Sequence, residues 1–152
     1  DINGNPSSII DNKPEEPTKN IKTIVPDDKN SKTVAGGYMV VTIPDKYISG
    51  TLFPYSDNSS ITENILLPHK LQRSMEYRIS IPEGKSWIKK ENVDLSNEIG
   101  EVSFHYENSG NEVVVTMEIN ISKQLITVNE YSKFYTLMTE LKDDNNYTVV
   151  MK

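Results

Sequence analysis

The chain contains no cysteine among its 152 residues. A thiolate nucleophile, a thiolate metal ligand and a disulfide are therefore excluded, whatever fold the chain adopts. Only two histidines are present, His69 and His105. Because the residues that most often carry nucleophilic and acid–base chemistry are absent or scarce, we predict that the chain is not an enzyme.

Long apolar runs and an excess of positive charge are also missing. No stretch reaches the length of a membrane span, and no charged-then-apolar leader precedes the first strand-like run, so we expect no transmembrane segment. The net charge is −6, which argues against nucleic acid or an anionic membrane as a partner. The chain begins at Asp1 without Met, which we interpret as an excised fragment or a mature exported form.

The composition changes after the first quarter of the chain. Residues 1–36 are rich in Asn, Ser and charge, and Pro6, Pro14 and Pro17 block regular structure. We predict that residues 1–36 form an extended linker or arm, in which the alternating residues 21–25 are able to add one edge strand. Residues 37–152 are predicted to form one β-sandwich domain.

Short β-rich runs and turns follow one another from residue 37 onward. The clearest pattern is a hairpin, in which apolar and polar residues alternate over 102–106 and 113–119 around a turn at 108–111. We expect seven to nine strands. The sequence thus predicts a mainly β fold, an antiparallel β-sandwich that is immunoglobulin-like in outline, with one short C-terminal helix before the last strand.

The predicted helix spans residues 126–141. Thr127 and Glu130 match the capping box, in which each residue's side chain bonds the other's backbone N–H. Apolar residues then recur at steps of three and four and form one stripe: Tyr131, Phe134, Leu137, Met138 and Leu141. We expect this stripe to pack against the sheet, because an amphipathic helix gains most of its stability in that way.

The pattern around the histidines and carboxylates does not predict a catalytic site. No G-x-S-x-G elbow is present, and His105 occupies the strand face opposite to Phe104 and Tyr106. A glycosidase needs two carboxyls that face each other across a cleft. We instead expect a solvated sheet face for the acidic residues of the hairpin region, which are Glu98, Glu101, Glu107, Glu112 and Glu118.

Other patterns do not predict a cofactor or a metal. Asp143 to Asn146 could supply oxygen ligands, but they lack the spacing of a calcium loop, so we expect a solvated turn. Phosphate loops and dinucleotide fingerprints are absent from the sequence. Three triplets, which begin at Asn58, Asn120 and Asn146, match the glycosylation sequon, a match that is common by chance. We predict no catalytic, cofactor-binding or metal-binding residue.

Five segments, taken in their order and spacing, resemble one family. They are LPHKL at 67–71, MEYRISIPEG at 75–84, GEVSF at 100–104 with the following NEVVVTMEINIS strand, ITVNEYSKF at 126–134, and YTVVMK at 147–152. Together they resemble the C-terminal β-domain of unknown function that follows a transglutaminase-like domain in exported proteins of Bacteroidetes-type bacteria. The resemblance covers residues 38–152.

The resemblance implies an accessory function. In such proteins the catalytic Cys, His and Asp belong to the preceding domain, so none transfers to this chain. The implied partner is the neighbouring transglutaminase- or cysteine-protease-like domain of the same polypeptide, and the implied location is periplasmic or cell-surface.

Two alternatives remain open at the level of sequence. One is a carbohydrate- or peptide-binding sandwich, with Trp87, Tyr55 and Tyr106 as stacking platforms for a glycan or protein ligand. The other is a hydrolase that uses His105 or His69 with a carboxylate.

Overall fold

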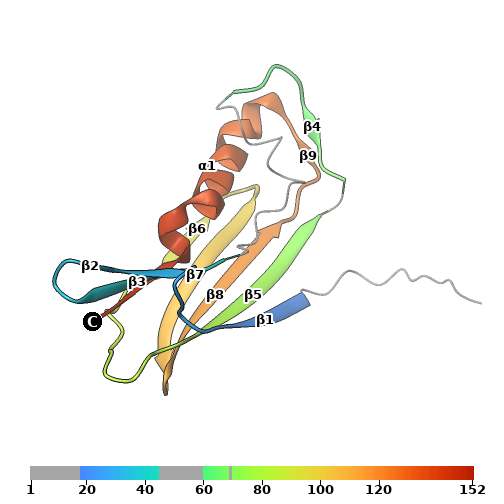
Figure 1. Ribbon diagram of the computed structural model, residues 1–152. Helices are drawn as coiled ribbons and strands as arrows, with labels where there is room; N and C mark the ends of the chain where they lie inside the picture. Colours follow the sequence, from blue (N-terminus) through green and yellow to red (C-terminus); the bar gives the residue numbers. More distant parts are fainter. Residues whose placement is uncertain (1–17, 45–59, 69) are drawn as a thin grey trace, which may run out of the picture.

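The computed structural model describes residues 18–44, 60–68 and 70–152 (Figure 1). Residues 47–53, one of the β-rich runs expected after residue 37, and the residues Tyr55, Asn58 and His69 lie outside this described part. The strands are β1 (Thr18–Ile24), β2 (Ser31–Val34), β3 (Tyr38–Thr42), β4 (Ile65–Leu66), β5 (Leu71–Ser80), β6 (Val93–Ser96), β7 (Gly100–Ser109), β8 (Glu112–Ile121), β9 (Leu125–Ile126) and β10 (Thr148–Met151). The helices are the α-helix α1 (Tyr131–Lys142) and the 3-10 helices η2 (Val128–Glu130) and η3 (Asp144–Tyr147).

The largest sheet has five strands in the order β1-β5-β8-β7-β6. The pairs β5–β8, β7–β8 and β6–β7 are antiparallel, whereas β1 runs parallel to β5. The predicted hairpin is confirmed as β7 and β8, which turn at Gly110 with φ of 61°. A positive φ is easily adopted by glycine, which explains how the chain reverses there.

Apolar and polar residues alternate along the strands of this sheet, so one face is buried and the other is exposed. Val102, Phe104 and Tyr106 of β7 point into the core, while the residues between them are exposed or half-buried. On β8 the inward positions are again apolar, from Val113 to Ile121. The outward face carries mainly polar and acidic side chains, as expected for a sheet with one solvated face.

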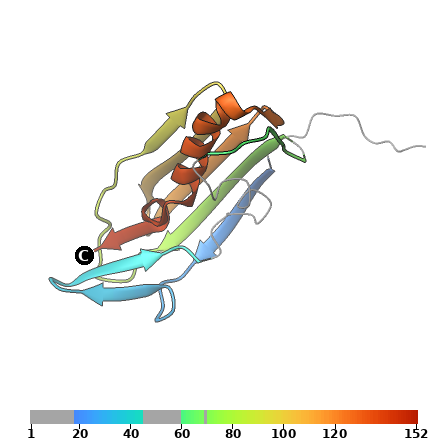
Figure 2. The same cartoon turned by 90° about the horizontal axis from the view of Figure 1, so that it is seen from above.

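The helix α1 covers the apolar face, as predicted (Figures 1 and 2). The capping box is present: the Glu130 backbone N–H donates to the Thr127 hydroxyl (3.3 Å), and the Thr127 N–H donates to the Glu130 carboxylate (3.1 Å). The first turn is 3-10, so α1 itself begins at Tyr131. Every residue of the predicted stripe is buried, and Phe134 is fully enclosed.

The second, three-stranded sheet has the order β10-β3-β2 and contributes to the same core. Val41 of β3 and Val149 and Met151 of β10 are buried in it, and the ring of Tyr147 meets Phe104 edge-on at 5.1 Å. The fold is therefore mainly β and dominated by antiparallel pairing, with one short helix before the last strand, as predicted. From residue 37 onward the described residues contain eight strands, β3 to β10, within the expected seven to nine, and two more, β1 and β2, lie in residues 1–36.

The N-terminal segment joins both sheets. In the predicted arm of residues 1–36, β1 lies at the edge of the five-stranded sheet and β2 pairs with β3. Ile24, at the end of β1, is buried in the common core. Within the described residues, no helix has the length and apolar character needed to cross a membrane.

Candidate functional site

The most prominent exposed apolar feature is a cluster that we name the apolar patch, formed by Leu66, Leu125 and Val128. Their exposed fractions are 69%, 49% and 42%. Leu66 of β4 and Leu125 of β9 are direct cross-strand partners, so their side chains stand next to each other. Large exposed apolar side chains that are contiguous mark interaction sites more often than isolated ones do.

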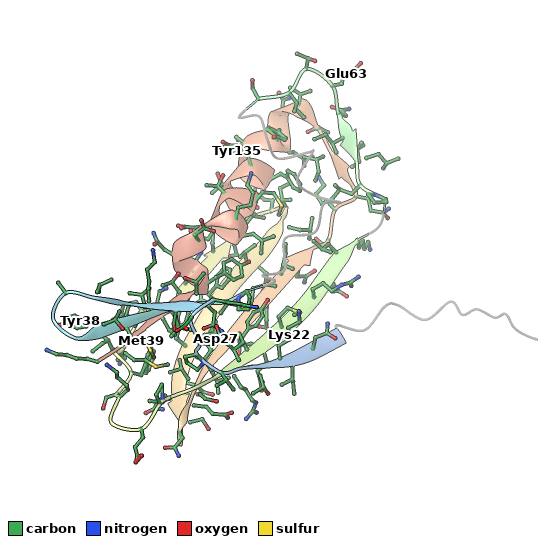
Figure 3. All side chains as sticks on the ribbon, viewed as in Figure 1. Lys22, Asp27, Tyr38, Met39, Glu63 and Tyr135 are labelled. Carbon is green, nitrogen blue, oxygen red and sulfur yellow. The ribbon has the colours of Figure 1, made fainter. Side chains whose placement is uncertain are left out.

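Hydrogen bonds hold the backbone under the apolar patch. The Leu67 N–H donates to the Gln124 carbonyl (2.8 Å), and the Gln124 side-chain amide donates to the Leu67 carbonyl (3.3 Å). The Val128 N–H donates to the Asn64 side chain (3.0 Å). These bonds place Val128 beside the two-stranded ribbon. The patch is thus a fixed surface at the tip of the molecule, where Figure 3 also labels Glu63 in the turn before β4.

The apolar patch lies beyond one end of the five-stranded sheet. Leu71, the first residue of β5, pairs with Ile121, the last residue of β8, and β4 and β9 continue past this end (Figure 1). Thr18, the first residue of β1, pairs with Arg73, near the start of β5. The described chain therefore enters the sheet at the end that carries the patch.

The C-terminus lies at the opposite end. The backbone of Lys152 exchanges two hydrogen bonds with Ser86 (2.8 and 2.9 Å), and Ser86 follows the far end of β5. Figures 1 and 2 show the same separation between the ribbon of β4 and β9 and the C-terminus. A partner placed on the patch would thus stay clear of the C-terminal strand.

His105 has a carboxylate partner, but its surroundings are those of a surface residue. Its Nε2 lies 2.7 Å from the Asp94 carboxylate, and both side chains are more than half exposed. Ser103 pairs with Asp94 and Thr116 pairs with His105 across the strands, so hydroxyls share this face. Among the described hydrogen bonds, neither hydroxyl reaches the imidazole. The pair ties β6 to β7 on the open face of the sheet.

Four of the five carboxylates of the hairpin region lie on the sheet as predicted, whereas Glu98 lies in the bend before β7 and pairs with Lys133 of α1. The side chains of Glu101, Glu107 and Glu118 are on the outward face. Glu101 and Glu118 line one shallow hollow of about 160 Å³ that opens on this face. Its volume is below that of an ordinary ligand-binding cleft, so it does not match the cleft that a glycosidase needs.

Sequence reasoning missed one carboxylate, Glu76 of β5. Alternation in MEYRIS places Glu76 on the same face as Arg78, but it does not indicate that Glu76 is buried. Glu76 is buried on the outward face, although charged residues are rarely buried unless they are paired. Arg78 bonds Glu76 at 2.6 Å and Glu112 at 3.3 Å. The hydrogen bond to Glu76 raises the pKa of Arg78 above its ordinary value. The three residues form an ion-pair network that links β5 to β8 on the outward face.

Two of the predicted stacking platforms, Tyr106 and Trp87, lie in the part of the chain that the structure describes. Tyr106 is buried, its hydroxyl donates to the Asn146 carbonyl (2.7 Å), and the Lys90 ammonium lies 4.8 Å from its ring centre. Burial raises the pKa of this phenol. The prediction that Tyr106 is a platform is therefore wrong. Trp87 is half-buried, and its indole nitrogen is enclosed by the protein.

The Asp143–Asn146 turn serves the helix. The Asp143 carboxylate accepts from the Asn145 N–H (2.9 Å). Asn146 is buried, and its amide donates to the carbonyl and the carboxylate of Glu140. The expected solvated turn holds for Asp143 to Asn145 but fails for Asn146, because this amide caps the end of α1. Within the described residues, no group of three metal-ligating side chains is present.

Two comparisons with known proteins give matches. The family profile described as "Domain of Unknown Function with solved-structure structure (DUF3858)" matches residues 37–151. A crystal structure described as a "putative protease" from Parabacteroides distasonis ATCC 8503 resembles this fold with a TM-score of 0.73 at 20% sequence identity. No curated protein matches the chain.

The extent of the structural match is unequal in the two chains. It covers 90% of this chain and 27% of the Parabacteroides chain, so the chain spans about a quarter of the length of that protein. It is also wider than residues 37–151, and it therefore takes in part of residues 1–36. The likeness in structure concerns the fold. Because the family profile spans most of the sequence, the chain belongs to the DUF3858 family, a domain of unknown function.

Proposed function

We propose that this chain is a non-catalytic accessory domain that binds and orients a neighbouring domain of the same exported bacterial polypeptide. The neighbour is of the transglutaminase or cysteine-protease type, and the polypeptide is periplasmic or at the cell surface. The contact surface on this side is the apolar patch. The observation that carries the proposal is the position of the patch at the end of the sheet where the chain enters through β1.

Geometry supports a neighbour that precedes this domain. A domain joined to the chain before Thr18 would be connected at the end of the sheet that carries Leu66 and Leu125. Linkage of this kind raises the effective concentration of the neighbour to the millimolar range for a short linker. A small apolar contact then suffices, since interfaces between domains of one chain are modest in area.

The comparison with the Parabacteroides protein supports the same arrangement. Nearly the whole of this chain matches about a quarter of that protein, which is described as a "putative protease". A module that recurs inside a longer chain of this description is suited to an accessory role. The sequence resemblance to domains that follow a transglutaminase-like domain points in the same direction.

The non-catalytic part of the proposal rests on the chemistry of the chain. It has no thiol, and the His105–Asp94 pair is solvent-exposed and lacks a bonded hydroxyl among the described residues. We expect no turnover of peptide or amide substrates by the 152-residue chain. The assay is repeated with His105→Ala and with His69→Ala. Turnover that disappears in either variant would overturn the proposal in favour of a hydrolase.

The coding sequence upstream of Asp1 tests the neighbour. We expect a domain with a Cys-His-Asp constellation there. An upstream region that encodes an unrelated domain, or none, contradicts the proposed neighbour.

The apolar patch is tested in the longer polypeptide. Leu66→Asp combined with Leu125→Asp should detach the two domains, which small-angle scattering detects as a larger radius of gyration. Ile88→Asp is the matched control: Ile88 is also exposed, at 43%, but it bonds β10 near the C-terminus. Equal scattering for the double variant and the control would show that the patch is not the contact.

A further inference from the structure

The edge strand β1 is held to the sheet in an unusual way. It pairs with β5 in parallel, from Thr18 opposite Arg73 to Ile24 opposite Ile79. Of its side chains from Asn20 to Ile24, only Ile24 is buried: its exposed fraction is 6%, against 58% for Ile21. Main-chain hydrogen bonds and a single apolar anchor therefore account for most of the attachment of β1.

The strand beneath it is very different. β5 has ten residues, most of them buried, among them Met75 and Tyr77. Without β1, the N–H and C=O groups along one side of β5 would be unpaired next to the core. An edge of this length is a template for any extended chain that can pair with it. The strand at the opposite edge of the sheet, β6, has only four residues.

The strand that covers this edge lies outside the family match. The family profile spans residues 37–151 and therefore includes β5 but not β1. The covering strand is thus supplied by the segment that precedes the family domain. In Figure 3 this segment carries the exposed Lys22 on β1, at the rim of the sheet.

We propose that the β5 edge is a strand-acceptor site for an extended peptide in parallel register, and that β1 is its exchangeable occupant. Its ligand class is a segment like residues 18–24, with one apolar residue that reaches the core beside Ile79 and with its other side chains exposed. Addition of a strand at a sheet edge is an established mode of peptide recognition, in which the main chain supplies affinity and a side-chain pocket supplies selectivity. This inference is independent of the proposed neighbour and of the apolar patch.

Hydrogen exchange on the unmodified chain is the first test. If β1 opens without the rest of the domain, its amides exchange at least about 100-fold faster than the amides of β5 that bond β8, because local opening is cheaper than global unfolding. Equal protection of the two groups of amides would overturn the proposal. This measurement needs no variant, so it holds even where a substitution prevents folding.

Peptide binding is the second test. A fluorescent peptide of residues 17–25 competes with β1 for the acceptor edge, so it binds the unmodified chain weakly. The Ile24→Asp chain removes the anchor of β1, and we expect it to bind the peptide at least about tenfold more tightly, by fluorescence anisotropy. Ile21→Asp is the matched control in the same strand, and it should bind like the unmodified chain.

The peptide itself provides the complementary control. Ile24→Asp in the peptide should abolish binding, whereas Ile21→Asp in the peptide should not. A concentration-dependent dimer of the unmodified chain, kept in Ile21→Asp and lost in Ile24→Asp, would support the same site with a second copy as occupant. A folded Ile24→Asp chain that fails to take up the peptide would overturn the proposal.

Discussion

The apolar stripe of α1 and the apolar patch consist of similar side chains. The side chains of the stripe are buried, whereas those of the patch are exposed. The helix α1 has twelve residues, long enough to lay the five apolar side chains of the stripe across the sheet. β4 and β9 have two residues each, so alternation turns Ile65 and Ile126 inward and leaves Leu66 and Leu125 outside. A short ribbon therefore shields only half of its apolar residues. The stripe therefore completes the core of this fold, whereas the apolar patch stays exposed on the surface.

The largest expected effect is on the stripe. Phe134→Ala should destabilise the domain by about 3–5 kcal/mol, as found for large aromatic residues truncated in a core. Urea unfolding followed by circular dichroism measures this. Tyr135, the next residue, is only half-buried (Figure 3) and is the control, since Tyr135→Ala should cost well under half as much. A nearly neutral Phe134→Ala would show that α1 does not complete the core.

Two adjacent leucines test whether the apolar patch is separate from the core. Leu67 is 1% exposed and Leu66 is 69% exposed. We expect Leu67→Ala to cost about 2–5 kcal/mol and Leu66→Ala to stay within about 0.5 kcal/mol in the same unfolding experiment. If Leu66→Ala is equally costly, the apolar patch is part of the core and not a free surface.

The capping box gives a smaller effect. Thr127→Ala removes the hydroxyl that accepts the Glu130 N–H, and it should cost about 1 kcal/mol of unfolding free energy. Thr139→Ala, at an exposed position inside α1, is the control and should be neutral or slightly stabilising, because alanine is the better helix former. A loss in both variants alike would mean that the cap contributes nothing specific.

The smallest effect is a pH dependence. The Lys123 ammonium and the Thr127 backbone bond the Glu130 carboxylate and hold its pKa below the ordinary value. The ionised form is thus favoured in the folded state, so its contribution is complete above the ordinary pKa and disappears as pH falls through the lowered one. Unfolding free energies of the unmodified chain and Glu130→Gln should converge between about pH 6 and pH 3. A gap that widens with acid would contradict this.

Local patterns in the sequence were sufficient for the parts of the fold that depend on neighbouring residues. The capping box at Thr127, the stripe and the β7–β8 hairpin each follow from spacing within a few positions. The same alternation placed Tyr106 beside Phe104 on the inward face, so the signal against an exposed platform was available.

The remaining features depend on residues far apart in the chain. Nothing local in residues 18–24 specifies β5 as their partner or a parallel direction, because three other strands, β2 to β4, lie between the two segments in the sequence. The apolar patch was also hidden, since a strand of two residues has no period to recognise. The burial of Glu76 depends on Arg78 and on the position of β5 between β1 and β8 in the sheet.

The parallel direction of β1 has a mechanical consequence. A force that pulls Thr18 away from Lys152 acts along the strands, because these residues lie at opposite ends of the sheet. The hydrogen bonds between β1 and β5 would then be loaded together in shear, whereas a sideways pull would open them one after another. In the absence of force, β1 can be replaced by another strand, yet under axial tension it resists removal. The domain would then transmit a pull between Thr18 and Lys152 without lengthening.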